Sequence, residues 1–346
     1  MNVNQYAQKY QLKPEIFISL YNINDKMQFV QEQCGHQELK SQVSMIREMS
    51  HIGKIEHKLN KDVSTFTSME MQMLFKDLNT AVKSTFQYRK SVIKKYLVWS
   101  FAKGNTNLQN IVDLDNISID QLDLSTIISS KYFRDFTDLK NGIDVLVKKH
   151  NPVDPEYDAV SCITMYLAWF GLSDKQICSL QRNEIDYCHG IINKDNRQFH
   201  VNDYVLNQIH DSLSKTEYDT MSDFSNHHRF FQYDTTTNNV IRRLQDNKVK
   251  QYNVFTLHSH VSTLLKYSDY FTQDDKYFQH TFGLKDIRDS GFFNRLYCYQ
   301  KNHKISVKTI DKSVIYHLLY VSRLSCTKLS NLLSEYAIWK EVFCNG

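Results

Sequence analysis

The stretch from residue 159 to residue 192 constrains the fold of this chain more than any other. It opens with a nearly unbroken apolar run at 159–170, long enough for about three turns of a buried helix. Gly171 follows, at the place where a glycine commonly ends a helix. Ser173 and Gln176 have the spacing of a capping box, which predicts a second, short helix directly after the first.

Beyond the short helix the pattern changes from helical to extended. Ile177 and Leu180 face inward from that helix, and a polar patch at 181–184 follows it. Residues 188–201 have the pattern of a two-stranded β-hairpin with its turn at 193–196. The stretch therefore predicts, in order, a buried helix, a glycine corner, a short helix and a hairpin.

The composition favours a mainly helical protein of two domains. A length of 346 residues suggests two domains, each able to bury its own core. A hydrophobic content of 41% and an aromatic content of 13% indicate a packed globular chain. The low counts of three prolines and nine glycines favour helices over a β-sandwich. The expected fold class is mainly α with a small β-hairpin or sheet.

Cysteine usage and apolar runs bear on the cellular compartment. The seven cysteines are odd in number and no two form a C-x-x-C pair, which argues against a disulfide framework and a zinc ribbon. The longest apolar run is far shorter than a membrane span, and the polar N-terminus does not resemble a signal peptide. We expect a cytoplasmic protein without membrane contact. A net charge of +4 indicates a nucleic-acid partner only if the basic residues cluster.

The domain boundaries follow from composition shifts. A helical domain is predicted at 1–110, an interdomain linker within the Asn- and Asp-rich stretch at 111–130, and a second domain at 131–346. The polar residues 216–253 predict a longer insertion with only local order. The helix that begins near Ser84 has an apolar stripe at helical spacing and basic residues on its other faces. The stripe comprises Tyr88, Val92, Tyr96 and Trp99, and the basic residues are Arg89, Lys90, Lys94 and Lys95.

Two of these stretches resemble the tyrosine recombinase (phage integrase) family. The start of the family's catalytic domain is matched at Gly171, Leu172, Gln176, Ile177, Leu180, Ile185 and Asp186. The last long helix of its core-binding domain is matched at Ser84, Thr85, Tyr88, Ile93, Tyr96, Leu97 and Trp99. The resemblance covers most of the chain. It implies a helical, SAM-like core-binding domain followed by an integrase catalytic-like domain, the two forming a clamp around duplex DNA.

The resemblance also implies where catalytic groups would lie. The family transfers a DNA phosphoryl group to a tyrosine, with two arginines and a lysine as further participants. Ser173 stands in place of the first arginine, while Arg288 matches the second. The corresponding positions in this chain are Ser173, Lys194, Lys285, Arg288, Asp289 and Tyr336, with Tyr320 a weaker candidate for the nucleophile.

The replaced positions argue against catalysis. Loss of one phosphate-clamping donor commonly lowers the rate on the order of 100-fold. Here the first arginine is replaced by Ser173, and the two histidines beside the second arginine are replaced by Lys285 and Asp289. Asp289 would also place a negative charge near a phosphate. We therefore expect no enzyme activity, no metal and no cofactor.

DNA binding does not depend on those positions in the same way, because affinity rests on many Lys and Arg contacts to phosphates. The residues expected to contact double-stranded DNA are Arg89, Lys90, Lys94, Lys95, Lys194, Arg242, Arg243, Lys285 and Arg288. A full-length fold with lost catalytic positions most resembles the integrase-like master repressors of SP-beta-type prophages. This resemblance implies a nucleoid-associated transcriptional repressor that controls lysis and lysogeny.

Other functions stay open. An active, divergent integrase would use Arg288, Lys194 and Tyr336, whereas an interaction protein would have lost DNA binding as well. A regulatory protein partner or self-association also stays open. Metal or cysteine chemistry is less favoured, since no helical H-x-x-x-H motif with a carboxylate is present and Cys188 with His189 has no partnered acid.

Overall fold

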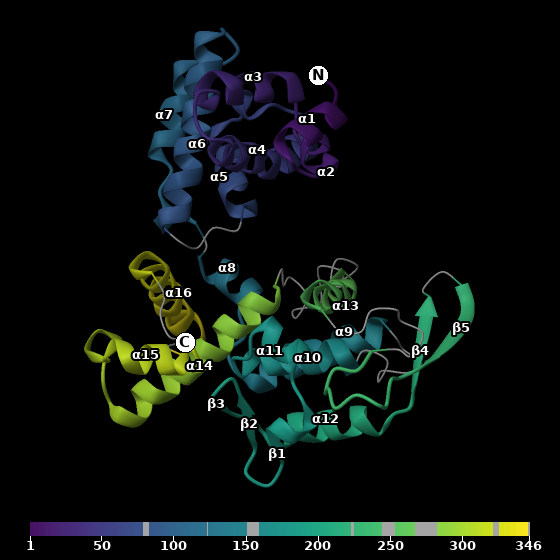
Figure 1. Ribbon diagram of the computed structural model, residues 1–346. Helices are drawn as coiled ribbons and strands as arrows, with labels where there is room; N and C mark the ends of the chain where they lie inside the picture. The colour runs from purple at the N-terminus through teal and green to yellow at the C-terminus, as the bar shows by residue number, and fades with distance from the viewer. Residues whose placement is uncertain are drawn as a thin grey trace. The chain divides into compact units, whose positions relative to one another are not determined.

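The computed structural model describes residues 1–78, 83–122, 124–150, 159–222, 225–243, 253–266, 282–320 and 325–344. The chain divides into two compact units, Met1–Ile127 and Ile128–Gly346 (Figure 1). Helices make up most of the described residues, and a three-stranded and a two-stranded sheet lie in the second unit. The predicted fold class, mainly α with a small sheet, is confirmed.

The first unit consists of helices around one apolar core. Its elements are α1 (Val3–Tyr10), α2 (Pro14–Ile18), α3 (Ile23–Cys34), α4 (Leu39–Leu59), η1 (Val63–Thr65), α5 (Ser68–Asp77), α6 (Lys83–Ala102), α7 (Leu108–Asn116) and η2 (Ile119–Gln121). Phe29, Ile46, Leu74, Phe86 and Ile93 are fully buried in this core. The stripe predicted on α6 is buried at Val92, Tyr96 and Trp99, whereas Tyr88 is exposed.

The residues predicted as a linker, 111–130, contain the division between the two units and are largely helical. α7 crosses the predicted boundary at residue 110, and α8 (Leu124–Lys131) spans the division between the two units. Ile111, Leu114 and Ile117 are buried in the core of the first unit. These three residues recur at a helical spacing, a pattern that the surrounding Asn and Asp residues concealed.

A charged cluster is buried beneath α4. Lys26 and Glu56 are both fully buried, and Lys26 Nζ lies 2.6 Å from Glu56 Oε1. The same ammonium lies 3.2 Å from Asp62 Oδ2 and 3.7 Å from the centre of the Tyr96 ring. Burial raises the pKa of Glu56 to about 7, although Lys26 acts in the opposite direction. The cluster connects α3, α4, α6 and the segment before η1.

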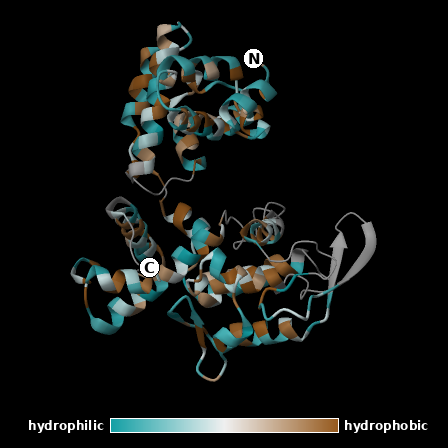
Figure 2. Ribbon diagram, in the orientation of Figure 1, coloured by the Kyte–Doolittle hydropathy of each residue, from teal (hydrophilic) through white to brown (hydrophobic). Residues whose placement is uncertain are grey.

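The second unit is organised around α10 (Ala159–Trp169), as the apolar run predicts. Met165, Leu167 and Ala168 have no exposed surface, and Figure 2 shows α10 mainly in hydrophobic colours. Five helices contact it: α9 (Phe136–His150), α11 (Asp174–Cys178), α12 (Asp203–Ser214), α13 (Val254–Lys266) and α14 (Leu284–His303). A helix buried on all sides has to be apolar on all sides, which explains the unbroken run.

The other elements of this unit are short, except for one helix near the C-terminus. They are η4 (Arg182–Glu184), β1 (Ile185–Asp186), β2 (Ile191–Lys194), β3 (Arg197–His200), β4 (Glu217–Ser222), β5 (Ser225–Gln232), η6 (Val307–Thr309), α15 (Lys312–Leu318) and α16 (Cys326–Cys344). The predicted hairpin is confirmed as β2 and β3. Asp195 and Asn196 form its turn with φ angles of 51° and 58°, the left-handed values of a type I′ turn.

Gly171 forms the corner after α10. Its φ angle is 102°, which an L side chain rarely adopts. A Cβ atom at this position would also overlap the ring of Tyr320. The corner therefore needs glycine for both its backbone angle and this close approach.

The insertion expected to have only local order, residues 216–253, is more ordered than predicted where it is described. β4 and β5 form an antiparallel pair. Val240 and Ile241 are buried in the core of the second unit, and Val240 N donates to Leu180 O at 2.8 Å. This apolar pair fixes the end of the insertion to the unit, while residues 244–252 lie outside the described residues.

Candidate functional site

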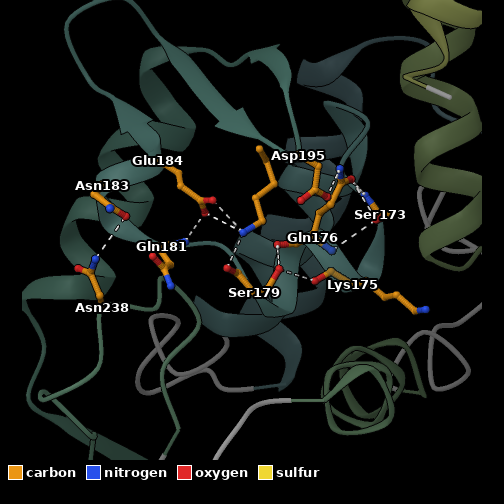
Figure 3. A network of polar contacts seen from close by, with 10 residues as sticks. Ser173, Lys175, Gln176, Ser179, Gln181, Asn183, Glu184, Asp195 and Asn238 are labelled. Carbon is orange, nitrogen blue, oxygen red and sulfur yellow. Dashed lines mark hydrogen bonds and ion pairs between the residues drawn. The ribbon is translucent and has the colours of Figure 1, made fainter. Parts of the chain in front are cut away.

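Ser173, which was predicted to stand at the position of the family's first arginine, caps α11. Its Oγ accepts a hydrogen bond from Gln176 N at 3.4 Å, and Gln176 Oε1 accepts one from Ser173 N at 2.9 Å. The predicted capping box is thus confirmed. Gln176 Nε2 also donates to Asp195 Oδ2 at 3.0 Å, which ties the hairpin turn to α11 (Figure 3). Ser173 serves the start of a helix and supplies no charge for a phosphate.

Lys194 is the last residue of β2, directly before the hairpin turn, and its side chain is only 9% exposed. Its Nζ lies 2.9 Å from both carboxylate oxygens of Glu184 and 2.7 Å from Ser179 O (Figure 3). An ammonium has three hydrogen-bond donors, and these contacts use all three. In this arrangement Lys194 ties η4 and the end of α11 to the hairpin.

Arg288 pairs with Asp174 of α11, a carboxylate that it shares with His258 of α13. Its Nη1 donates to Asp174 Oδ1, while His258 Nε2 lies 2.8 Å from Asp174 Oδ2. Burial opposes ionisation of Asp174, but the hydrogen bonds from Arg288 and His258 outweigh it and lower the pKa of this carboxyl. An internal carboxylate is therefore hydrogen-bonded to the guanidinium that was predicted to match the family's second arginine.

Lys285 and Asp289 form an ion pair with each other on α14. The Lys285 side chain is 71% exposed and that of Asp289 only 14%. Burial raises the pKa of Asp289, while Lys285 acts in the opposite direction. Asp286 of α14 and Glu335 of α16 lie 3.6 and 3.3 Å from Lys131 Nζ, so three carboxylates and two lysines gather at this end of α14. Both lysines are therefore paired with internal carboxylates.

Tyr336, the candidate nucleophile, is 1% exposed and lies in the core of the second unit. Its hydroxyl donates to Gln300 Oε1, and its ring stacks on Trp339 with centroids 6.0 Å apart. Burial raises its pKa above the ordinary tyrosine value. Tyr320, the weaker candidate, is half-buried and has a left-handed φ angle of 55°. Among the described residues, neither Tyr320 nor Tyr336 forms a hydrogen bond or a ring contact with Arg288.

Three of the four basic residues predicted on α6 bind acceptors within the first unit. Arg89 donates to a main-chain carbonyl at the end of α5 and lies 3.3 Å from a carboxylate of α4. Lys90 Nζ donates to two main-chain carbonyls at the end of α7, at 2.9 and 2.6 Å. Lys94 Nζ lies 2.6 Å from Asp115 Oδ2. Lys95 is exposed and has no ion-pair partner in the described part of the chain.

Arg242 and Arg243 also have internal partners. Arg242 is 3% exposed, donates to main-chain carbonyls at the end of α12 and lies over the ring of Tyr233 at 4.5 Å. Arg243 Nε donates to Asp234 Oδ2 at 2.9 Å. The two arginines thus hold the end of the insertion against α12 and the turn at Asp234.

An exposed basic stripe on α4 was not predicted from the sequence. It comprises Lys40, Ser44, Arg47, His51, Lys54 and Lys58, all exposed. Residues at this alternating spacing of four and three share one helix face. Lys58 lies 3.8 Å from Asp77, and the other three Lys and Arg residues have no ion-pair partner within the described ranges. The apolar spacing of this segment predicts a helix, and the basic residues at its polar positions could have revealed the stripe.

Arg295, also missed by sequence reasoning, joins the C-terminal ends of two helices. Its Nη1 donates to Trp169 O at 2.7 Å at the end of α10, and its Nε to Leu318 O at 3.1 Å at the end of α15. Its guanidinium lies 5.0 Å from the centre of the Tyr320 ring. Burial lowers the pKa of Arg295 to about 10, so it stays charged at neutral pH beside two negative helix ends.

A cavity of about 1080 Å³ opens between the hairpin and α15. Arg197, Gln198 and His200 line it from β3, and His317 lines it from α15. Two of the catalytic candidates, Lys194 and Tyr320, also line this cavity. Lys194 and Tyr320 thus line one cavity, while Arg288 and His258 share the carboxylate of Asp174. The helix that carries Asp174, α11, is also tied to the hairpin turn by the hydrogen bond from Gln176 to Asp195.

The described residues hold no group of three His, Cys, Asp or Glu side chains placed to bind a metal ion. His189 Nδ1 lies 2.7 Å from Asp186 Oδ2, which gives this histidine a structural partner next to Cys188. Among the described helices, none combines the length and the apolar character needed to cross a membrane.

Comparison with known proteins bears on the first unit. Residues 20–102 match the family model described as "MrpR, N-terminal core-binding domain". The crystal structure of XerA recombinase superposes with a TM-score of 0.37 and 11% sequence identity, over 93% of this chain and 98% of that chain. So loose a superposition has no bearing on the fold of the second unit. No curated protein matches this sequence.

Proposed function

We propose that this chain is a non-catalytic, sequence-specific double-stranded DNA-binding protein of tyrosine-recombinase fold. The basic stripe on α4 carries the proposal, because it lies within the residues that match a core-binding domain. From Lys40 to Lys58 the stripe is about 27 Å long, at a rise of about 1.5 Å per residue. A line of exposed positive charge attracts the phosphates of a duplex without regard to sequence and positions it for base contacts.

The absence of catalysis is supported by what the candidate catalytic residues do instead. Ser173 caps a helix, Arg288 is paired with Asp174, and Tyr336 is buried with its hydroxyl bonded to Gln300. A reaction through Arg288 and Tyr336 would require a phosphate to displace Asp174 and Tyr336 to leave the core. Both steps cost free energy that an active site arranged in advance avoids.

We further propose that the protein represses phage or prophage transcription and so controls lysis and lysogeny. A protein that binds an operator and leaves it uncut blocks transcription for as long as it stays bound. The match of the first unit to the MrpR domain and the resemblance to integrase-like master repressors support this role. It would act in the cytoplasm, on the nucleoid.

The decisive experiment maps the DNA bound by the full chain in its host and then measures affinity for one bound fragment against salt concentration. We expect enrichment at a few sites near phage genes and a steep linear fall of log affinity with log salt. A flat salt dependence would favour the interaction protein. A covalent protein–DNA adduct on nicked substrate would favour the integrase.

A further inference from the structure

The three-stranded sheet of the second unit has an open edge at β3, because the strand order is β1-β2-β3. Val201 N donates to Gly190 O at 2.9 Å, which marks one hydrogen-bonded pair of the β2–β3 ladder. Along two antiparallel strands, hydrogen-bonded residue pairs alternate with pairs whose backbone groups point away from the partner strand. The backbone N–H and C=O groups of Gln198 and His200 therefore point away from β2, and no described strand pairs with them.

The cavity of about 1080 Å³ lies along this edge. Its opposite wall is α15, from which Tyr316 and His317 line it. In Figure 1, β3 is the strand drawn nearest to α15. An unpaired strand edge beside an open groove is the geometry in which an extended peptide adds to a sheet.

The charges along the groove favour an acidic peptide. Its two carboxylates already have partners, since Glu184 binds Lys194 and Asp195 accepts a hydrogen bond from Gln176. Arg197 has no ion-pair partner within the described residues. His200 and His317 are exposed on the two walls of the groove.

We infer that the groove between β3 and α15 binds an extended acidic segment of a partner protein, which adds to the sheet as a fourth strand. Backbone groups of the segment bond to Gln198 and His200, and one of its carboxylates pairs with Arg197. A nucleic acid lacks the alternating N–H and C=O groups that this edge requires. The inference does not depend on DNA binding, since the basic stripe lies on α4 of the other unit.

The test uses the full chain and a fluorescein-labelled peptide of alternating Glu and Val, about seven residues long. Gln198→Pro removes the outward N–H at an edge position where proline is tolerated, whereas Gln198→Ala keeps that N–H and removes only the side chain. We expect Gln198→Pro and Arg197→Glu to weaken binding at least about tenfold and Gln198→Ala to change it less than about twofold. Equal binding by the Pro and Ala variants, or no binding by the parent chain at millimolar peptide, overturns the inference.

The ligand provides a second test that needs no variant of the protein. Peptides N-methylated at alternate residues block one edge of the added strand, and peptides methylated in the other register block the opposite edge. We expect only the register that faces β3 to lose binding, and equal loss in both registers contradicts strand addition. Self-association of the parent chain that disappears in Gln198→Pro would assign the edge to a second copy and overturn the partner peptide.

Discussion

Asp174 and Arg288, 114 residues apart in the sequence, form an ion pair that joins the first residue of α11 to α14. His258 binds the second oxygen of the same carboxylate at 2.8 Å. One aspartate therefore satisfies both basic groups that face this point of the second unit. A DNA phosphate can reach Arg288 only in competition with this carboxylate.

Replacing Asp174 by Asn should make Arg288 available to DNA. We expect higher affinity and a salt dependence steeper by about one, the value of one additional phosphate contact. The matched control is Asp203→Asn, which removes the same charge from the first residue of α12 without releasing an arginine. Identical salt slopes for the two variants would place Arg288 outside the DNA contact surface.

The stripe on α4 makes a direct prediction for DNA affinity. The double variant with Arg47→Ala and Lys54→Ala should bind every DNA sequence more weakly, with a salt slope lower by about two. Lys13→Ala with Lys76→Ala is the control, because these exposed lysines lie in the same unit outside the stripe. Fluorescence anisotropy at several salt concentrations measures both slopes. If the control variant loses as much DNA affinity as the stripe variant, the stripe on α4 is not the DNA contact surface.

His51 should make DNA binding depend on pH. Partial desolvation lowers its pKa, and Arg89, Lys54 and Arg47 add to this effect against Glu48. A DNA phosphate beside the stripe would raise the pKa again, so binding should take up a proton and strengthen as the pH falls below about 6.5. His51→Gln should abolish the extra affinity. A pH profile that is the same in His51→Gln as in the parent chain contradicts the contact.

In the free protein, His51 makes the folding stability fall as the pH is lowered, whereas it makes DNA affinity rise. Its lowered pKa means that the unfolded chain binds more protons just below pH 6.5. This group therefore stabilises the fold less as the pH falls through that window, and His51→Gln should reduce the effect in urea unfolding.

Tyr336→Phe distinguishes a structural tyrosine from a nucleophile. The variant loses the hydrogen bond to Gln300 in the core, so the free energy of unfolding should fall by about 1 kcal/mol. DNA affinity should stay unchanged, and neither the parent chain nor the variant should form a covalent adduct on nicked DNA. Tyr320→Phe is the companion variant, because it removes the hydroxyl of the other candidate. An adduct that disappears with either substitution would restore the integrase.

The buried cation of the first unit should be needed for stability. Lys26→Met leaves Glu56 without its closest partner in a site with no exposed surface. We expect the free energy of unfolding to fall by about 3 kcal/mol at neutral pH, as measured by urea. The double variant with Glu56→Gln should recover part of this loss. If the double variant is no more stable than Lys26→Met, the unpaired Glu56 carboxylate is not the cause of the lost stability.

Local structure was predictable from the sequence where neighbouring residues determine it. The capping box at Ser173 and Gln176, the glycine corner and the buried α10 all depend on residues a few positions apart. The helix at the start of the predicted linker was not foreseen, because a polar composition outweighed the helical spacing of Ile111 and Leu114.

The partners of the charged residues were not predictable in this way. Lys194 meets Glu184 only because η4 turns back beneath the hairpin, and Arg288 meets Asp174 across 114 residues. A sequence shows where the lysines and arginines are. It does not show which carboxylates or carbonyl groups lie beside them in the folded protein. Eight of the nine residues predicted to contact DNA therefore have internal partners, while exposed Lys95 has no ion-pair partner among the described residues.

Arg295 has a mechanical consequence for the second unit. Because one guanidinium anchors the last turns of both α10 and α15, a ligand that displaces α15 must either drag the glycine corner with it or break a charged hydrogen bond. The corner leads within three residues to Asp174, the acid that restrains Arg288. Occupancy of one surface can thus be transmitted as a physical displacement to a cation elsewhere in the same unit.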